Sequence, residues 1–308
     1  MKVARTALAK GFAILAVGAI ALTGCTYESE KLDRPAGGAT AAPFDLDSVK
    51  ADQSLAAQLP ENIKNRGSLI IGSNTEYPPA ESLDSTGKPT GYDIEMITAI
   101  AKKLGLKAEI QSAEFTGILP ALGGKYDVGI SSFTVTAERL KNVNMVSFLN
   151  VGTTWAVQTG NPKKVDLNNI CGLSVGVQTG TTQEDPDLSG RNAKCKAAGK
   201  QPINVVTLKN QTDITTRLIN GSIDAMTADS PITGYAISQT GGKVEKLSDA
   251  YDQAPQGIAV AKGNTALAEL VKKTLESLKE DGSYKKILDA WGSGDSAIET
   301  FQVNPEVN

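Results

Sequence analysis

The sequence predicts an α/β fold with mostly parallel β-sheets. Three observations lead to this prediction: short apolar runs end at glycine or polar residues, amphipathic segments with a helical repeat lie between them, and the alternation occurs twice along the chain. Ligands of such sheets bind beyond the carboxyl ends of the strands. We therefore expect a functional site in the loops that follow the strands.

The first round of alternation starts near Gly67. Ser68 to Gly72 is an apolar run closed by glycine, which is typical of a buried strand. Asp93 can cap the helix that follows, and Gly105 can end it. The expected elements are a strand at 68–72, a helix at 93–104, a strand at 107–111, a helix at 115–122 and a strand at 127–131.

The second round starts at Leu173 and repeats the pattern. Pro186 falls where a helix would otherwise run, so we expect that helix to begin late. The expected strands lie at 173–177, 203–208, 223–227 and 257–261, and the expected helices at 212–220, 231–239, 266–279 and 284–291. The chain thus contains two α/β units.

The first 25 residues have the organisation of a secretory signal. Lys2, Arg5 and Lys10 precede an apolar run at 11–21 that is too short to span a bilayer, and Leu-Thr-Gly-Cys follows at 22–25. This pattern predicts a signal peptide at 1–24, a lipid on Cys25 and an anchor on the outside of the cytoplasmic membrane. The alternative is a plain signal peptide that happens to contain a cysteine.

A tether is expected between the anchor and the folded body. Residues 34–43 are rich in Ala, Gly and Pro and have no apolar periodicity, so we expect 25–65 to form a flexible, lipid-anchored linker.

Composition excludes several classes of function. Removing residues 1–24 takes away three cations and changes the formal charge from -3 to -6, and no basic tract remains, so we expect no nucleic-acid partner. The chain has no histidine, which excludes His-based catalysis and disfavours a zinc site. We expect no metal, no cofactor and no catalytic residue.

Cys171 and Cys195 remain once Cys25 is lipidated. Two cysteines outside the cytoplasm most often form a disulfide, and closing this loop contributes about 3 kcal/mol on a chain-entropy estimate. Two free buried thiols are the alternative.

Arg139 is the most suggestive single residue. Thr136 is a plausible N-cap, which places Arg139 in the first helical turn, where the helix dipole disfavours a cation. An anion held by Arg139 and the Thr134 hydroxyl would reverse that penalty. The Gly-Thr-Thr turn at 180–182 is a second anion-accepting feature. A solvated arginine paired with a carboxylate is the alternative.

Asp229 follows a predicted strand and could pair with an ammonium group. It could equally be the N-cap of the helix that begins at Ser230. Tyr77 and Phe115 could enclose the aliphatic part of a ligand, although aromatic residues beside strands usually belong to the core.

Four segments together resemble the extracytoplasmic solute-binding proteins of ABC transporters, family 3, polar amino acid type. The segments are Gly-Tyr-Asp-Ile-Glu-Met at 91–96, Ser-Ser-Phe-Thr at 131–134 with Arg139, Gly-Val-Gln-Thr-Gly-Thr-Thr at 176–182, and Gly-Ser-Ile-Asp-Ala at 221–225 leading to Asp229. Their order and spacing extend the resemblance over residues 67–291.

The resemblance implies a two-lobed fold of the type II periplasmic-binding-protein class with hinge strands at 153–157 and 256–260. The implied lobe one comprises 66–153 and 256–293, lobe two comprises 158–254, and a C-terminal tail covers 294–308.

The resemblance also implies how an amino acid is held. Arg139 and the backbone of Thr134 and Thr182 would bind its α-carboxylate. Asp229 and the Ser132 carbonyl would bind its α-ammonium group.

The side-chain end of the site departs from the usual family pattern. Tyr77 and Phe115 would flank the ligand side chain. Members that take basic side chains often carry an acid at the position of Asn74, whereas here the nearby acid is Glu76, and Gln178 adds a further polar group. We expect a basic or neutral polar amino acid rather than an acidic one.

The expected function is ligand capture outside the cytoplasmic membrane and delivery to an ABC permease by lobe closure, carried out by a monomer. Two alternatives remain open at this point. An enzyme of the same fold, such as a cyclic-acid dehydratase, would need a proton-transferring acid, for which Glu76 is the obvious candidate. A ligand-sensing receptor component would have to act through a partner.

Overall fold

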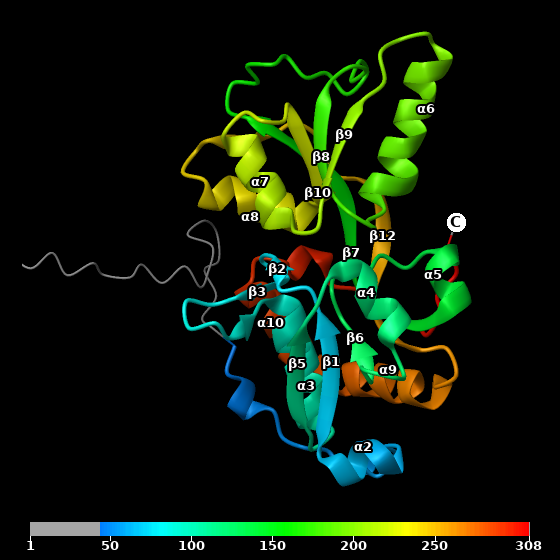
Figure 1. The fold of residues 1–308 in the computed structure, drawn as a ribbon. Coiled ribbons are helices and arrows are strands. Elements are labelled where there is room, and N and C mark those ends of the chain that lie inside the picture. The colour runs from blue at the N-terminus through cyan, green and yellow to red at the C-terminus, as the bar shows by residue number, and fades with distance from the viewer. Residues whose placement is uncertain (1–43, 308) are drawn as a thin grey trace, which may run out of the picture. The chain divides into compact units, whose positions relative to one another are not determined.

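The computed structural model describes residues 44–307, which belong to one compact unit. The predicted signal peptide, Cys25 and the first part of the tether lie outside the described residues. The fold class is the predicted one, α/β with two lobes (Figure 1). Within residues 44–307 no helix has the length and apolar content that a bilayer span requires.

Lobe one is built around the parallel strands β5, β1 and β6. Its short strands β2, β3 and β4 form a separate antiparallel sheet. Its elements are α1 (Gln53–Ala56), α2 (Glu61–Arg66), β1 (Ser68–Ser73), β2 (Glu76–Tyr77), β3 (Glu81–Leu83), β4 (Pro89–Thr90), α3 (Tyr92–Lys103), β5 (Lys107–Ser112), α4 (Phe115–Ile118), β6 (Val128–Gly129), α5 (Ala137–Asn142), α9 (Thr265–Glu280) and α10 (Ser283–Ala290).

Lobe two is built around the parallel strands β10, β8 and β9. An irregular turn at Gln183–Leu188 precedes α6, which starts late, as Pro186 predicts. Its elements are β8 (Ser174–Gln178), α6 (Ser189–Ala197), β9 (Asn204–Leu208), α7 (Gln211–Ile219), β10 (Ala225–Asp229), α8 (Ser230–Gln239) and β11 (Val244–Lys246).

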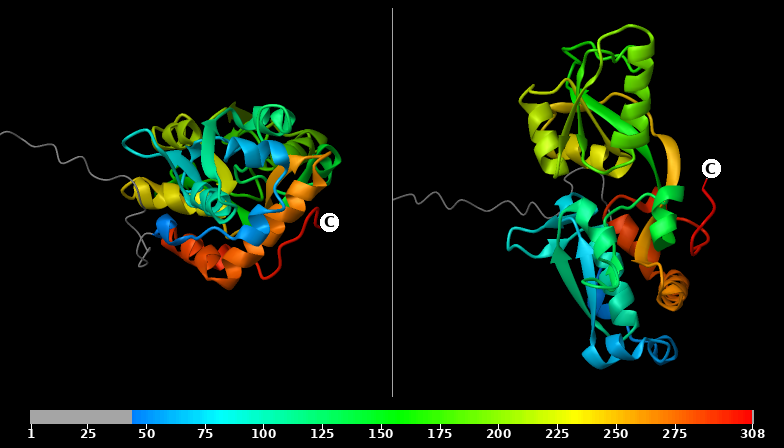
Figure 2. Two further views of the ribbon diagram at one scale, coloured as in Figure 1. Left: turned by 90° about the horizontal axis from the view of Figure 1, so that it is seen from below. Right: turned by 45° about the vertical axis from the view of Figure 1, so that its right-hand side comes forward.

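Two long strands, β7 (Val143–Gln158) and β12 (Tyr251–Ala261), connect the lobes (Figures 1 and 2). β7 pairs antiparallel with β12 from Val143 to Thr153 and with β10 from Thr153 onward. The sheet order is therefore β5-β1-β6-β12-β7-β10-β8-β9, and it runs through both lobes. The carboxyl ends of the parallel strands of each lobe meet the cleft between them.

The N-terminus of α3 requires a glycine. Gly91 has φ 127°, and a Cβ there would lie 2.1 Å from the Ala80 carbonyl oxygen. Asp93 is the second helical residue and does not cap the helix, contrary to expectation. Its carboxylate instead accepts the backbone N–H of Ser132 at 2.7 Å.

The chain enters the folded body earlier than the predicted tether boundary at residue 65. Val49, Leu55, Leu59 and Ile63 are buried in the main core of lobe one. In this segment α1 packs against α9, and α2 packs against β1. The C-terminal residues also pack, since Phe301 is 2% exposed and Val303 pairs with Val146.

Two predicted elements of lobe one are shorter than expected. The helix at 115–122 breaks into α4 and a 3-10 turn at Leu119–Ala121, because Pro120 lacks the N–H that an α-helix needs. The strand at 127–131 is reduced to β6, after which the chain turns at Ser132.

The predicted disulfide between Cys171 and Cys195 is present and ties the turn before β8 to α6, so the free-thiol alternative is wrong. Both cysteines pack with the apolar core of lobe two.

Candidate functional site

Both lobes contribute to one small polar cleft at the carboxyl ends of the strands. Eight of the ten predicted ligand-contact residues line it, and Asn74 and Glu76 lie beside it. The lining residues are Tyr77, Phe115, Ser131, Ser132, Thr134, Arg139, Gln178, Thr181, Thr182, Gln183 and Asp229. The cavity is about 10 Å³, roughly the space that one water molecule needs, so the lobes are closed against each other.

Arg139 projects from the start of α5, where Thr136 caps the helix by accepting the Arg139 N–H, as predicted. Arg139 Nη1 donates to the Thr134 carbonyl oxygen at 2.8 Å, and Nη2 donates to the Gly180 carbonyl oxygen of lobe two at 3.1 Å. The Phe115 ring lies 5.5 Å from its guanidinium carbon. Desolvation lowers the pKa of Arg139 to about 10, so the group remains a cation.

Asp229 faces Arg139 from lobe two. It occupies the N-cap position of α8, but its side chain makes no capping bond and lines the cleft. Its Oδ2 accepts from Tyr77 Oη at 3.1 Å. Burial raises the pKa of Asp229 to about 6, while the bonds from Gln183 and Tyr77 and the charge of Arg139 oppose the rise.

Two further cross-lobe contacts lie beside the cleft. Gln178 Nε2 donates to Asn74 Oδ1 at 3.2 Å. Thr212 Oγ1 donates to Glu76 Oε2 at 2.8 Å. Asn74 and Glu76 therefore contact lobe two without lining the cavity itself.

Sequence reasoning missed two glutamines that hold Asp229. Gln183 Nε2 donates to Asp229 Oδ1 at 2.9 Å and to Thr153 Oγ1 at 3.0 Å. Gln256 Nε2, from the hinge strand β12, donates to Asp229 Oδ2 at 2.8 Å. Gln183 directly follows the predicted site residue Thr182, and Gln256 directly precedes an apolar run. The sequence therefore gave only a weak indication that either residue belongs to the site.

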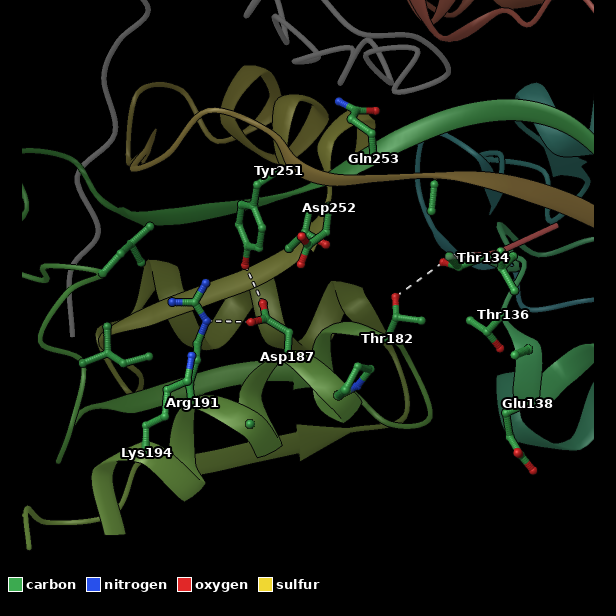
Figure 3. A pocket seen from close by; sticks show the side chains of 18 of the residues that line it. Thr134, Thr136, Glu138, Thr182, Asp187, Arg191, Lys194, Tyr251, Asp252 and Gln253 are labelled. Carbon is green, nitrogen blue, oxygen red and sulfur yellow. Dashed lines mark hydrogen bonds and ion pairs between the residues drawn. The ribbon is translucent and has the colours of Figure 1, made fainter. Parts of the chain in front are cut away.

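A much larger pocket, about 1290 Å³, lies on the hinge side of the cleft (Figure 3). On its wall, Asp187 accepts hydrogen bonds from Arg191 Nε at 2.6 Å and from Tyr251 Oη. The weak Thr134–Thr182 contact, 3.5 Å between the hydroxyl oxygens, lies at its edge. We favour the smaller cleft as the ligand site, because Arg139 of lobe one and the buried carboxylate of Asp229 of lobe two both line it.

No group of three or more Asp, Glu or Cys side chains within residues 44–307 is arranged to hold a metal ion.

The comparison with protein families identifies the group to which this fold and cleft belong. Residues 69–294 match the model of bacterial extracellular solute-binding proteins, family 3. The chain belongs to this family. It is similar to the arginine-binding protein ArgT of Corynebacterium glutamicum, with 34% identity over 253 residues, covering 82% of this chain and 83% of that protein.

Solved structures of this family agree with the two-lobed fold. An ancestral arginine-binding protein bound to arginine has a TM-score of 0.67 and 36% identity, covering 73% of this chain and 98% of that one. The ancestral amino acid-binding protein AncCDT-1, a precursor of cyclohexadienyl dehydratase, has a TM-score of 0.65 and 32% identity, covering 75% and 98%.

Proposed function

We propose that the protein captures a basic amino acid, with L-arginine as the first candidate, and delivers it to an ABC permease. The observation that carries this proposal is the convergence of Arg139 from lobe one and Asp229 from lobe two on one buried cleft. An α-amino acid carries the complementary pair of charges on one carbon.

Ligand capture follows from the donors and acceptors in the cleft. The guanidinium of Arg139 has five N–H donors, and the two backbone carbonyls engage two of them, so a ligand carboxylate can use the others. Asp229 is an acceptor for the α-ammonium group, and the Ser132 carbonyl is a second one. Each charge-assisted bond contributes about 1.5–3 kcal/mol, and bonds to both lobes form together only in the closed state, so the ligand shifts the hinge equilibrium.

Glu76 is our proposed partner for a basic side chain. It lies on β2, one residue before the cleft residue Tyr77, and its Oε2 accepts a hydrogen bond from Thr212 of lobe two. Relatives named as arginine-binding proteins support a basic ligand. A neutral polar ligand would instead use the Asn74–Gln178 pair.

A thermal-shift screen of the purified protein against the common amino acids tests this proposal. A ligand at 100 times its Kd stabilises the folded state by about 2.7 kcal/mol, which raises the Tm of a chain of this size by about 5–10 °C. We expect L-arginine to give the largest shift. A Glu76→Gln variant should lose more affinity for L-arginine than for L-glutamine, whereas Glu61→Gln, on exposed α2, should change neither.

We propose that the protein is a binding protein and not an enzyme. Relatives named as binding proteins support this, and AncCDT-1, although a dehydratase precursor, is itself named as an amino acid-binding protein. Glu76 is held by Thr212 and serves ligand charge recognition in our account. Turnover of cyclic carboxylic acids by the purified protein would contradict it.

We also propose that the mature chain is a monomer held to the outer face of the membrane by a lipid on Cys25. The signal sequence and its terminal cysteine support the anchor. Cys25→Ser should release the protein from the membrane fraction. For the lobes we propose the boundaries 66–153 with 256–293 and 158–254, with the segment at 49–63 and Phe301 packed onto the core of lobe one. Limited proteolysis at the hinge tests these boundaries.

A further inference from the structure

Two fully buried carboxyl groups lie behind the cleft in lobe one. Glu81 of β3 and Asp93 of α3 are both 0% exposed. Glu81 Oε1 accepts a hydrogen bond from Ser131 Oγ at 2.7 Å, and Asp93 Oδ2 accepts one from the Ser132 N–H at 2.7 Å. The two acids therefore hold consecutive residues of the loop that lines the cleft.

The elements that carry these acids are packed tightly together. The Asp93 N–H donates to the Ala80 carbonyl oxygen at 3.0 Å, one residue before Glu81. Gly91 allows this approach, because any Cβ there would collide with the same carbonyl. The two carboxyl groups therefore lie close together, since each is hydrogen-bonded to one of the consecutive residues Ser131 and Ser132.

The second oxygen of each acid is buried without a hydrogen-bond partner among residues 44–307. Glu81 Oε2 and Asp93 Oδ1 accept no bond from an N–H or hydroxyl group of the described residues. None of the ion pairs of residues 44–307 includes either acid. A bond between two carboxyl groups needs a proton on one of them, because an ionised carboxylate only accepts. Two adjacent carboxylates buried without a cation cannot both stay ionised.

We propose that Glu81 and Asp93 share one proton at neutral pH, and that this pair positions the Ser131–Ser132 loop for the ammonium group of the ligand. The second part rests on the proposed function, since it assigns that role to the Ser132 carbonyl. Ser132 has φ 50°, in the left-handed region that serine rarely adopts. Its bond to Asp93 holds it there.

The electrostatics of the surroundings agree with one retained proton. Burial raises the pKa of Asp93 to about 7, and burial together with the charge of Asp93 raises the pKa of Glu81 well above its usual range, so the pair retains a proton at neutral pH. The titratable and charged groups around this region are Tyr92 of α3, Asp229 of β10, Tyr77 of β2 and Arg139 of α5, the last two acting on Asp229.

The proton has a predictable effect on stability. A carboxyl group whose pKa is raised in the folded state binds its proton more tightly there than in the unfolded chain. Its contribution is therefore greatest at low pH and declines as the pH rises through the folded-state pKa. We expect the Tm of the wild-type protein to fall from neutral to alkaline pH as the shared proton is lost.

Glu81→Gln supplies a permanent N–H donor in place of the proton. We expect this variant to keep its affinity for the ligand within about threefold of wild type and to lose part of the alkaline decline in Tm. Glu81→Ala removes both the donor and the bond to Ser131, and should weaken ligand binding by about tenfold or more. Glu61→Gln, on exposed α2, is the matched control and should behave as wild type.

Infrared spectroscopy tests the proton without any ligand. The wild-type protein at pH 7 should show a protonated carboxylic acid band that Glu81→Gln lacks and Glu61→Gln keeps. If that band is absent from wild type, or survives in Glu81→Gln, the shared proton is overturned even if the protein binds an amino acid. If Glu81→Ala is folded and binds as tightly as wild type, the positioning role is overturned. A wild-type protein that binds no amino acid contradicts the proposed function and leaves the infrared result standing.

Discussion

Replacing Arg139 with Ala should abolish most of the ligand affinity while the fold persists. The guanidinium offers a bidentate grip on a carboxylate from a desolvated position under the Phe115 ring. Losing two charge-assisted bonds of about 1.5–3 kcal/mol each costs about 3–6 kcal/mol, which is about a 10²- to 10⁴-fold rise in Kd. Arg139→Lys keeps the positive charge but cannot form two parallel hydrogen bonds to a carboxylate, so its loss of affinity should be intermediate.

Isothermal titration calorimetry measures this effect, and circular dichroism confirms the fold. Lys141→Ala is the matched control, because Lys141 is an exposed cation on the same helix and pairs with Glu138 at 2.6 Å. Arg139 also lowers the pKa of Asp229, so its removal should move the pH dependence of any residual binding to higher pH. An Arg139→Ala protein that binds the ligand within about threefold of wild type would refute the assigned carboxylate site.

Three further predictions concern pH, the disulfide and the start of α3. The ammonium group of a ligand stabilises ionised Asp229, whose pKa without ligand is about 6. The affinity for the ligand should therefore be constant above pH 6 and fall below it, and an affinity that stays unchanged down to pH 5 would contradict this. Reducing the Cys171–Cys195 bridge, which spans 24 residues, should cost about 3 kcal/mol and lower the Tm by about 6–12 °C, and an unchanged melting curve would show that the bridge adds nothing. Gly91→Ala should destabilise by at least about 2 kcal/mol in urea denaturation, because its Cβ would meet the Ala80 carbonyl oxygen; full stability would disprove the close approach.

The alternation of elements was predictable because each strand and helix is a local pattern. The helix boundaries at 212–220, 231–239 and 266–279 agree with α7, α8 and α9 to within one residue at each end. Packing of the segment before residue 66 was not predicted, because α1 packs against α9, which lies near the other end of the chain.

Site residues could be predicted from the sequence where they belong to a local motif. Those that reach the site through a contact between distant parts of the chain were harder to predict. Arg139 lies in a first helical turn and Asp229 lies at the end of a strand, and both positions could be recognised from the neighbouring residues. Gln256 reaches Asp229 because β12 and β10 both pair with β7, which no neighbouring residue in the sequence reveals. The role of Asp93 changed for the same reason, because its partner Ser132 is 39 positions away.

A crystal structure of the protein with bound L-arginine tests the central claim most directly. Our account predicts the α-carboxylate on the Arg139 guanidinium, the α-ammonium group on Asp229, and the side chain directed toward Glu76. An amino acid bound in the hinge-side pocket beside Arg191, or held in the cleft with its carboxylate away from Arg139, would contradict it.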